Sequence, residues 1–344
     1  MGFDGHGGMW VSELELNRLV RFDAHGDPGA SLILASPGAS GLEADGRMFA
    51  LYGDSDLGTP PAGVVTFDPT AATPVAKPFV SGFTMANGGA VDAAGNLYVA
   101  NSLTPGILKF SPTGVLDRAF EQATQITGAD GVAIDGRTLY VTQITSASAT
   151  IVQVPLDDPK AHAVLASLAP LIGPDDLAIG PDGALYVALA GGQLVRVDRS
   201  TGAACTVIDA GVPLTSVRFP TGFPPYSADS GDAFVTSELG EILHVHLSGL
   251  KVPPATAARI RVYVSPRRTH LGRHTITITT RSDSPTCATL VSVRVGRHRS
   301  RTNANGQTRV RLRFTRTGTD LIVARKTGCQ SGCTKLRVIS TSQR

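Results

Sequence analysis

Short apolar runs alternate with glycine-containing turns along the first 250 residues, and the runs recur at a regular interval. Three segments align without gaps over six positions, and each continues through a turn into a second and then a third apolar run. The segments begin at Asn87, Asp130 and Asp175, which are 43 and 45 residues apart. This spacing is typical of the four-stranded sheet that forms one blade of a β-propeller.

Weaker copies of the pattern, at residues 9–22, 40–67 and 215–245, complete a set of six. The sequence therefore predicts an all-β fold with a six-bladed β-propeller over residues 1–250. We expect the first blade to be incomplete, because no innermost strand is evident before Asp4, and the last blade shows no obvious fourth strand near Leu250. An unclosed propeller would expose strand edges, so we expect the sequence to be shortened at its start.

The pattern changes after a proline-containing hinge at residues 251–254. Longer runs now alternate strictly between apolar and polar positions, which predicts strands that bury one face. These runs cover residues 259–264, 274–280, 289–295, 308–314, 320–324 and 335–339. Residues 303–306, Asn-Ala-Asn-Gly, are a good hairpin signal. Six or seven strands in about 90 residues predict a small immunoglobulin-like β-sandwich over residues 255–344.

Charge divides the chain at the same point, although the net charge is only +3. Residues 251–344 hold 20 Lys and Arg, of which 17 are Arg, but only Asp283 and Asp320 as acids, a balance of +18. The remainder holds 11 basic and 26 acidic residues, a balance of −15. The basic domain could meet an anionic envelope polymer or the acidic propeller, or its arginines could merely solubilise exposed strands. Nucleic acid is not favoured, because no aromatic residues are interspersed among the arginines.

Cysteine usage favours a secreted or cell-surface protein. Three of the four cysteines fall in the small domain, where a disulfide would support a modest core. We expect Cys287 to pair with Cys329, with Cys333 as the alternative partner, and Cys205 to be a small buried hydrophobe. No apolar stretch reaches the roughly 18 residues needed to span a bilayer. The first nine residues lack a signal-peptide core, so either an export signal preceded them or the protein stays inside.

Propeller topology places the starts of first strands and the ends of second strands at one mouth of the central channel. The starts are Ser40, Asn87, Asp130, Asp175 and Thr215, and the ends are Glu13, Asn101, Gln143, Ser237 and Glu238. Carboxylate and amide oxygens are the ligands that Ca²⁺ and Mg²⁺ prefer. We therefore predict a divalent cation held by Asn87, Asp130 and Asp175, and substrate contacts from Asn101, Gln143 and Asp176. The alternative is that each Asp or Asn only shapes a turn, as we expect for the acids of the opposite face, Asp45, Asp92, Asp135 and Asp182.

At these residues the chain resembles the gluconolactonase and regucalcin family of six-bladed propellers. Asn87-Gly88 is similar to the family's Asn-Gly, and residues 130–135 are similar to its Asp-Gly-x-x-x-Asp segment. The resemblance implies that Asn87 and Asp130 bind Ca²⁺ or Zn²⁺, and that the metal polarises a sugar-lactone carbonyl while a carboxylate assists water. The family's first-blade Glu ligand has no counterpart here, so Glu13 or Asp175 would substitute for it.

Two further resemblances are local. Residues 10–13 and 17–21 are similar to streptogramin lyase repeats. Residues 289–329 are similar to immunoglobulin-like modules of bacterial surface proteins.

Two functions of different classes follow. The first is a metal-dependent hydrolase of a lactone or small ester, with Glu13 or Asp130 as general base. The second is a non-catalytic propeller that binds a small ligand or partner and is carried to an anionic envelope polymer by its basic domain. A streptogramin-lyase-like enzyme is a third reading. A serine or cysteine hydrolase is not indicated, because no nucleophile motif is present. We expect a monomer, and we expect His244 and His246 to be packing or solvent residues.

Overall fold

The computed structural model describes residues 1–55, 62–247, 260–282, 285–326, 329 and 331–340. The chain divides into two compact units. The first comprises Met1–Gly202 and Thr206–Leu250, and the second comprises Ala203–Cys205 and Lys251–Arg344. The hinge predicted at residues 251–254 lies outside the described residues.

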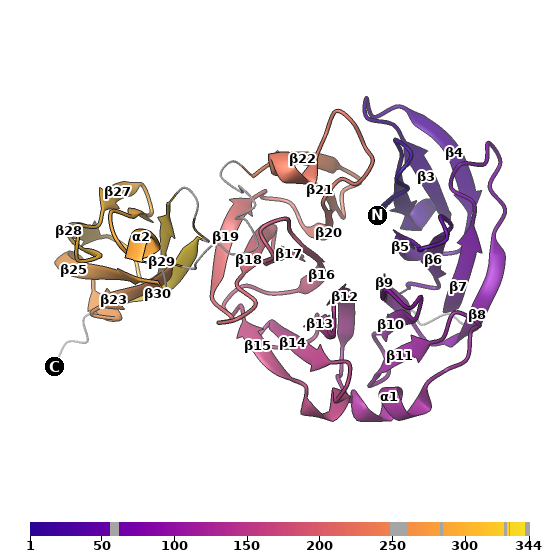
Figure 1. The fold of residues 1–344 in the computed structure, drawn as a ribbon, viewed down its shortest axis with the longest axis horizontal. Coiled ribbons are helices and arrows are strands. Elements are labelled where there is room, and N and C mark those ends of the chain that lie inside the picture. The colour runs from indigo at the N-terminus through magenta and orange to yellow at the C-terminus, as the bar shows by residue number, and fades with distance from the viewer. Residues whose placement is uncertain (56–61, 248–259, 283–284, 327–328, 330, 341–344) are drawn as a thin grey trace. The chain divides into compact units, whose positions relative to one another are not determined.

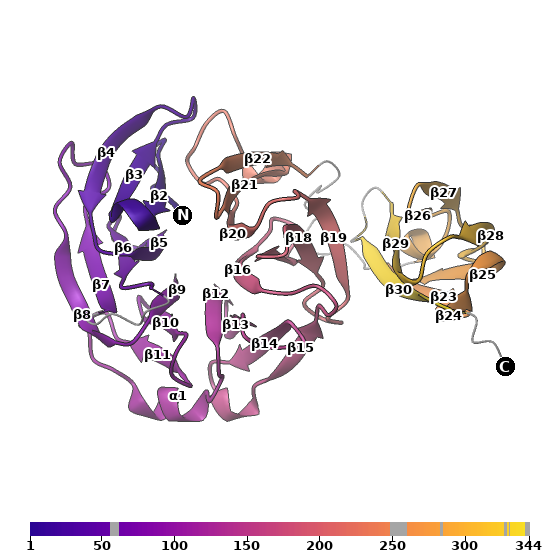
Figure 2. The same ribbon diagram turned by 180° about the vertical axis from the view of Figure 1, so that it is seen from behind.

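Six antiparallel sheets follow one another around a common axis in the described part of the first unit, which confirms the six-bladed β-propeller (Figure 1). Each sheet contains three or four strands in chain order, and the first strand is nearest the axis (Figure 2). Blade one contains β1 (Gly2–Phe3), β2 (Met9–Glu13), β3 (Arg18–Phe22) and β4 (Pro28–Ile33), and blade two contains β5 (Pro37–Leu42), β6 (Met48–Tyr52), β7 (Ala62–Phe67) and β8 (Lys77–Phe83). Blade three contains β9 (Ala86–Val91), β10 (Leu97–Asn101) and β11 (Ile107–Phe110), and blade four contains β12 (Ala129–Asp135), β13 (Thr138–Gln143), β14 (Thr150–Pro155) and β15 (Ala163–Ser167). Blade five contains β16 (Pro174–Ile179), β17 (Leu185–Leu189), β18 (Gln193–Val197) and β19 (Ala204–Asp209), and blade six contains β20 (Leu214–Arg218), β21 (Asp232–Ser237) and β22 (Ile242–His246).

Blade one has an innermost strand, so the expectation that it lacks one before Asp4 was wrong. β1 is only two residues long, and Gly2 and Phe3 pair with Trp10 and Met9 of β2. So short a strand carries no period-2 signal, which is why the pattern missed it. The fourth strand of blade six would fall near residue 250, outside the described residues.

The hydrophobic core of the propeller lies between neighbouring blades. Fully buried Trp10 of blade one packs edge-on against Phe67 of blade two, with 5.0 Å between ring centroids. Blade six closes on blade one in the same way, because Phe3 packs against Phe223 and Phe234 at 5.1 and 5.7 Å. Since buried aromatic pairs contribute beyond their area, these contacts hold the first strands in a fixed ring.

Short helices fill some of the connections. In blade three, α1 (Arg118–Ala123) follows β11, and Asp117 caps it by accepting a hydrogen bond from the Phe120 N–H at 3.0 Å. Three single-turn helices are η1 (Leu14–Leu16), η2 (Pro159–Ala161) and η3 (Ala228–Ser230). No helix in the described part of the chain is long and apolar enough to cross a membrane.

The second unit contains two sheets that share one core. One sheet has the order β23-β25-β28 and the other β24-β30-β29-β26-β27. The elements are β23 (Arg261–Ser265), β24 (Arg268–His270), β25 (Gly272–Arg281), α2 (Pro285–Ala288), β26 (Ser292–Val295), β27 (His298–Arg301), β28 (Gln307–Phe314), β29 (Gly318–Arg325) and β30 (Gly332–Ile339). All six predicted strands are present in the described residues, while β24 and β27 were not predicted. Gly306, at a φ of +70°, forms the predicted turn before β28.

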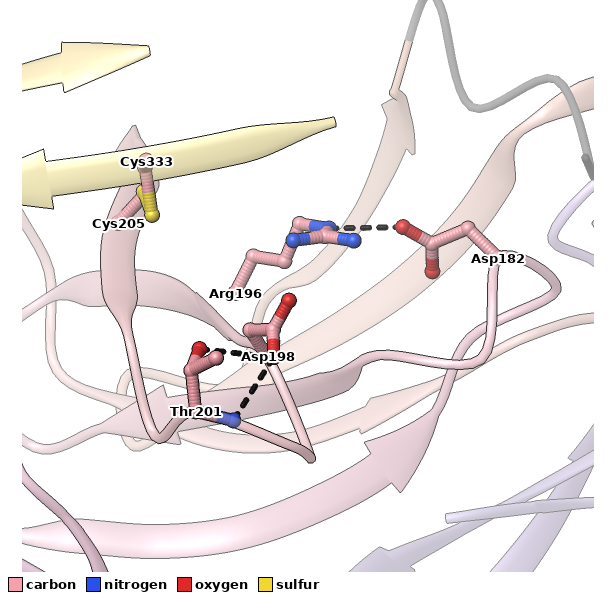
Figure 3. Close-up of a disulfide and its surroundings, with 6 residues drawn as sticks. All are labelled: Asp182, Arg196, Asp198, Thr201, Cys205 and Cys333. Carbon is pink, nitrogen blue, oxygen red and sulfur yellow. Dashed lines mark hydrogen bonds and ion pairs between the residues drawn. A yellow bond between two sulfur atoms is a disulfide. The ribbon is translucent and has the colours of Figure 1, made fainter. Parts of the chain in front are cut away.

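Two disulfides are present, and only one was predicted. Cys287 pairs with Cys329, as expected. Cys205 is buried, but its assignment as a plain hydrophobe was wrong, because it is bonded to Cys333 (Figure 3). The turn before Cys205 is held by Asp198, which accepts hydrogen bonds from the Thr201 N–H at 3.0 Å and hydroxyl at 2.8 Å. A partner 128 residues away leaves no local signal in the sequence.

Candidate functional site

The first strands of blades three to five begin with polar residues in equivalent register. Ala86, Ala129 and Pro174 pair with the last residues of their second strands, so Asn87, Asp130 and Asp175 occupy the same position on β9, β12 and β16. In each of these strands the register shifts across this position, so that the polar residue lies within a β-bulge. A bulge changes the direction of the side chains that it carries, and the bulge lies at the mouth of the channel in all three blades.

Blade two does not contribute the residue that was expected. Pro37 pairs with Tyr52, so the position equivalent to Asn87 is occupied by Gly38. Ser40 was predicted at the mouth, but it lies two residues further along β5 and lines the channel below. Gly38 has no polar side chain to mark the start of the strand, so the polar pattern pointed to Ser40 instead.

Glycine brings neighbouring first strands into unusually close contact at this mouth. A Cβ atom at Gly88 would overlap the carbonyl oxygen of Asp130, and one at Gly131 would overlap that of Asp175. Packing therefore explains why glycine follows Asn87 and Asp130, because only glycine lets the neighbouring strands approach this closely. The consequence is that Asn87, Asp130 and Asp175 lie on adjacent, closely packed strands.

Carboxyl groups gather at this mouth and affect one another. Asp130 is fully buried. Burial raises the pKa of Asp175 well above its ordinary value, and the charges of Asp130, Asp176, Asp54 and Glu238 raise it further. Like charges at a buried site favour a shared proton or a bound cation, since either relieves the repulsion.

Thr142 connects blades four and five directly beneath these acids. Its hydroxyl is fully buried on β13, accepts the Gly131 N–H at 2.7 Å and donates to the carbonyl oxygen of Asp175. Ser12 occupies the equivalent position in blade one and donates to the carbonyl oxygen of Gly38 at 2.6 Å. A hydroxyl at this position therefore joins a second strand to the first-strand start of the next blade.

Two other predicted site residues, Asn101 and Gln143, use their polar groups within their own blades. Asn101 accepts hydrogen bonds from the Thr84 hydroxyl at 2.8 Å and the Met85 N–H at 3.0 Å. Gln143 donates to the carbonyl oxygen of Thr127 at 2.9 Å and accepts the Thr150 hydroxyl at 2.7 Å.

Glu13 forms an ion pair with Arg18, with 2.5 Å between Oε2 and Nε. Blade one thus supplies no acid to the group around Asp175.

Asp176 is also engaged. Its Oδ2 forms an ion pair with Arg218 at 2.5 Å and accepts the Ser216 hydroxyl at 2.6 Å, while Oδ1 accepts the Leu177 N–H at 2.8 Å. Arg218 also lines a channel cavity of about 230 Å³ whose other walls include Phe49, Val132 and Leu177. The channel is therefore polar at the mouth and mainly apolar below it.

Sequence reasoning missed Asp54, which is the acid that blade two contributes. Asp54 lies two residues beyond β6, and its Cβ would be 3.3 Å from a Cβ added at Gly38. Its N–H bonds to the carbonyl oxygen of Ser36 at 2.9 Å. The signal was available, because Asp54 follows a second strand just as Glu238 does, but the intervening Tyr52-Gly53 hid the equivalence.

The acids of the opposite face hold turns. Asp45, Asp92 and Asp182 each accept the N–H of the residue two positions later, at 3.1, 2.9 and 3.2 Å, which confirms their expected role. Asp135 instead pairs with Arg199.

His244 and His246 contact Asp232, with 3.0 and 3.1 Å from its Oδ1 to Nε2 and Nδ1. The His244 ring also packs on Tyr226, 4.6 Å away between centroids.

The donor set at the mouth suits a hard divalent cation only if amide and backbone oxygens take part. In the described ranges, no three His, Cys, Asp or Glu side chains are grouped so that they could hold a metal ion. Ca²⁺ accepts carboxylate, amide and backbone carbonyl oxygens together, and Asn87, Asp130 and Asp175 offer all three. The buried repulsion at Asp175 is the observation that makes a cation fit here.

Known proteins resemble the chain in fold. The model of the N-terminal region of strictosidine synthase-like proteins matches residues 161–197. A gluconolactonase from Xanthomonas campestris is 18% identical, with a TM-score of 0.55 over 69% of this chain and 80% of that one. A calcium-binding regucalcin from Agrobacterium tumefaciens is 17% identical, with a TM-score of 0.51 over 68% and 80%. No curated protein matches the chain significantly. These similarities show a six-bladed propeller of the kind found in gluconolactonases and regucalcin.

Proposed function

We propose that the propeller binds a divalent cation at the acidic mouth of its channel and hydrolyses a lactone or a similar small ester there. The observation that carries this proposal is that Asn87, Asp130 and Asp175 occupy equivalent positions on adjacent, closely packed strands at the mouth, where burial and neighbouring acids raise the pKa of Asp175. Ca²⁺ is the first candidate, with Mg²⁺ and Zn²⁺ as alternatives. The gluconolactonase and the calcium-binding regucalcin that share the fold support the same class of ligand and substrate.

Asn87, Asp130 and Asp175 would hold the cation, and a bound cation would supply Lewis-acid polarisation of the ester carbonyl. Glu13 is held by Arg18, so we assign the general-base role to Asp130 or to the nearby carboxylates of Asp54 and Glu238.

The second candidate is a non-catalytic propeller that binds a small ligand at the same mouth. It is favoured by the commitment of Glu13, Asn101 and Gln143 to bonds within their own blades, which leaves fewer polar groups for chemistry. We also propose that the protein functions outside the cytoplasm, since its two disulfides persist in oxidising surroundings.

Thermal unfolding with and without Ca²⁺ tests the cation site, using the wild type, Asp130→Asn and the control Asp45→Asn. A ligand at about a hundredfold excess over its Kd should raise the Tm by about 5 °C or more. We expect this shift in the wild type and the control, whose acid holds a turn on the opposite face, and its loss in Asp130→Asn.

A panel of lactones, assayed with and without a chelator, separates the two functions. Chelator-sensitive hydrolysis would support the enzyme. Cation binding without hydrolysis of any lactone would support the binding protein. Equal Tm values with and without Ca²⁺, Mg²⁺ and Zn²⁺ would rule out the cation site and with it the enzyme.

A further inference from the structure

The outer face of one sheet in the second unit is built from arginine. On β28, exposed Arg309, Arg311 and Arg313 alternate with buried residues such as Val310 and Phe314. Because successive side chains of a strand point to opposite faces, the three arginines project together away from the core. They form a straight row with about 7 Å between neighbours, twice the rise per residue.

The neighbouring strand extends this face without neutralising it. Arg273 of β25 lies directly opposite Arg313, and Thr275 and Thr277 lie opposite the other two arginines. Like charges in directly opposed positions destabilise a sheet. The hydroxyl groups beside the row can donate hydrogen bonds to an anion but cannot balance the charge.

Two more arginines lie at the far end of the same sheet. Arg281 of β25 pairs in register with Arg261 of β23, and its guanidinium packs over the ring of Tyr263 at 5.7 Å. We call these six residues the arginine face: Arg261, Arg273, Arg281, Arg309, Arg311 and Arg313.

No acidic residue occurs in the sequences of the three strands that carry the arginine face. The second unit has only two acids in all, and of these Asp320 belongs to β29 in the other sheet while Asp283 lies outside the described residues. The row on β28 therefore concentrates positive charge, and the strands beside it contribute no acid.

The choice of arginine over lysine indicates the kind of anion. A guanidinium presents a planar fork of donors that matches the oxygens of a phosphate group, whereas lysine acts as a point charge. All six cations of the face are arginine, and the row on β28 is linear. One phosphate cannot contact three guanidinium groups spaced at about 7 Å, but a chain of phosphates can.

We propose that the arginine face binds a linear polymer that carries phosphate groups at regular intervals. The polymer lies along β28, where the three guanidinium groups bind phosphates spaced along the polymer and the threonines of β25 donate to their free oxygens. Nucleic acid is disfavoured as the polymer, because the face offers Tyr263 as its only aromatic ring, and recognition of single strands relies on several such stacking platforms. This interaction is independent of the channel and of its cation.

The test measures binding of the full chain to long-chain inorganic polyphosphate, by titration at several salt concentrations. In Arg309→Gln/Arg311→Gln/Arg313→Gln we expect the affinity to fall by about tenfold or more, because three charge-assisted contacts are lost. The slope of log affinity against log salt should fall by about 2, as for the loss of three phosphate contacts. The matched control is Arg294→Gln/Arg299→Gln/Arg337→Gln, which removes equal charge from exposed positions of the other sheet. Its affinity should change by less than about threefold.

Four outcomes would overturn the proposal. Equal losses in the two triple variants would show that diffuse charge binds the polymer. Equal affinity for polyphosphate and pyrophosphate would show that the arginine face does not bind several phosphates of one chain at once. Tighter binding of single-stranded DNA would indicate a nucleic acid partner, and tighter binding of phosphatidylglycerol vesicles would indicate a membrane surface. Circular dichroism of both variants shows whether the fold survives the substitutions.

Discussion

The acidic mouth of the propeller and the arginine face of the second unit both concentrate like charges, but the mouth includes fully buried Asp130 whereas the arginines are exposed. At the mouth, burial raises the pKa of Asp175, so the site can lower its charge by taking up a proton or a cation. Arginine does not lose its proton in proteins, so the exposed face can only be screened by salt or covered by anions. The mouth can therefore bind a single cation at one place, whereas the arginine face attracts anions along its length with an affinity that depends on salt.

The two units also differ in how they are stabilised. The propeller distributes its core over the interfaces between blades, and aromatic pairs such as Trp10 with Phe67 join neighbouring sheets. The second unit has one core cluster, mainly of valine and isoleucine, with a disulfide against it. Loss of that disulfide should therefore affect the second unit far more than the propeller.

Replacing both Cys287 and Cys329 by alanine should give the largest effect. The bond links residues 42 positions apart, so its removal should destabilise the second unit by about 4 kcal/mol through the entropy of the unfolded chain. Trp10 is the single tryptophan and reports on the propeller, whereas far-ultraviolet circular dichroism reports on both units. In a denaturant titration of the variant, we expect part of the dichroism signal to be lost at a lower denaturant concentration than in the wild type. The midpoint of the Trp10 fluorescence transition should not change. An equal shift of both signals would show that the two units unfold together.

Thr142→Val should have the next largest effect, this time on the propeller. Valine keeps the shape of threonine but leaves the Gly131 N–H and the Asp175 carbonyl without the hydroxyl, which should cost about 2 kcal/mol. The Trp10 transition measures the loss, and Ca²⁺ titration should show weaker binding because the bulge that carries Asp130 is no longer held. Ser12→Ala is the matched comparison, since it removes one such bond at the equivalent position and should cost about 1 kcal/mol. Equal costs for the two variants would mean that the Thr142 hydroxyl has no special role beneath the acids.

The repeat predicted the propeller and most of the mouth, because blades of similar length bring equivalent residues around one axis. Asn87, Asp130 and Asp175 occupy matching positions for that reason. The position of Ser40 was wrong because Gly38, which stands where the other blades have Asn or Asp, carries no polar side chain that the pattern could register. The loop bonds of Asn101 and Gln143 depend on backbone geometry that no periodicity encodes.

Strict alternation in the second unit predicted its strands except β24 and β27. The order of its strands was not predictable, because alternation fixes which face of a strand is buried but says nothing of its neighbours. The disulfide between Cys205 and Cys333 was not predicted for a related reason, since only the folded arrangement brings these residues together.

Asp175→Asn should give the smallest effect. It tests the acidic mouth by changing how the stability of the propeller depends on pH. The raised pKa of Asp175 means that the folded protein holds this proton more tightly than the unfolded chain does. The resulting stability is present in full below the ordinary carboxyl value of 3.8 and is lost as the pH rises through the raised pKa. With a chelator present, we therefore expect the wild type to lose stability over this rise and Asp175→Asn, which cannot ionise, to lose less. The variant should resemble the wild type at low pH, because asparagine approximates the protonated carboxyl in size. In a parallel series without chelator, added Ca²⁺ should stabilise the wild type more at high pH, where Asp175 is charged, and should have little effect on the variant. Parallel pH profiles for the two proteins would mean that Asp175 ionises normally, and the repulsion on which the cation site depends would then be absent.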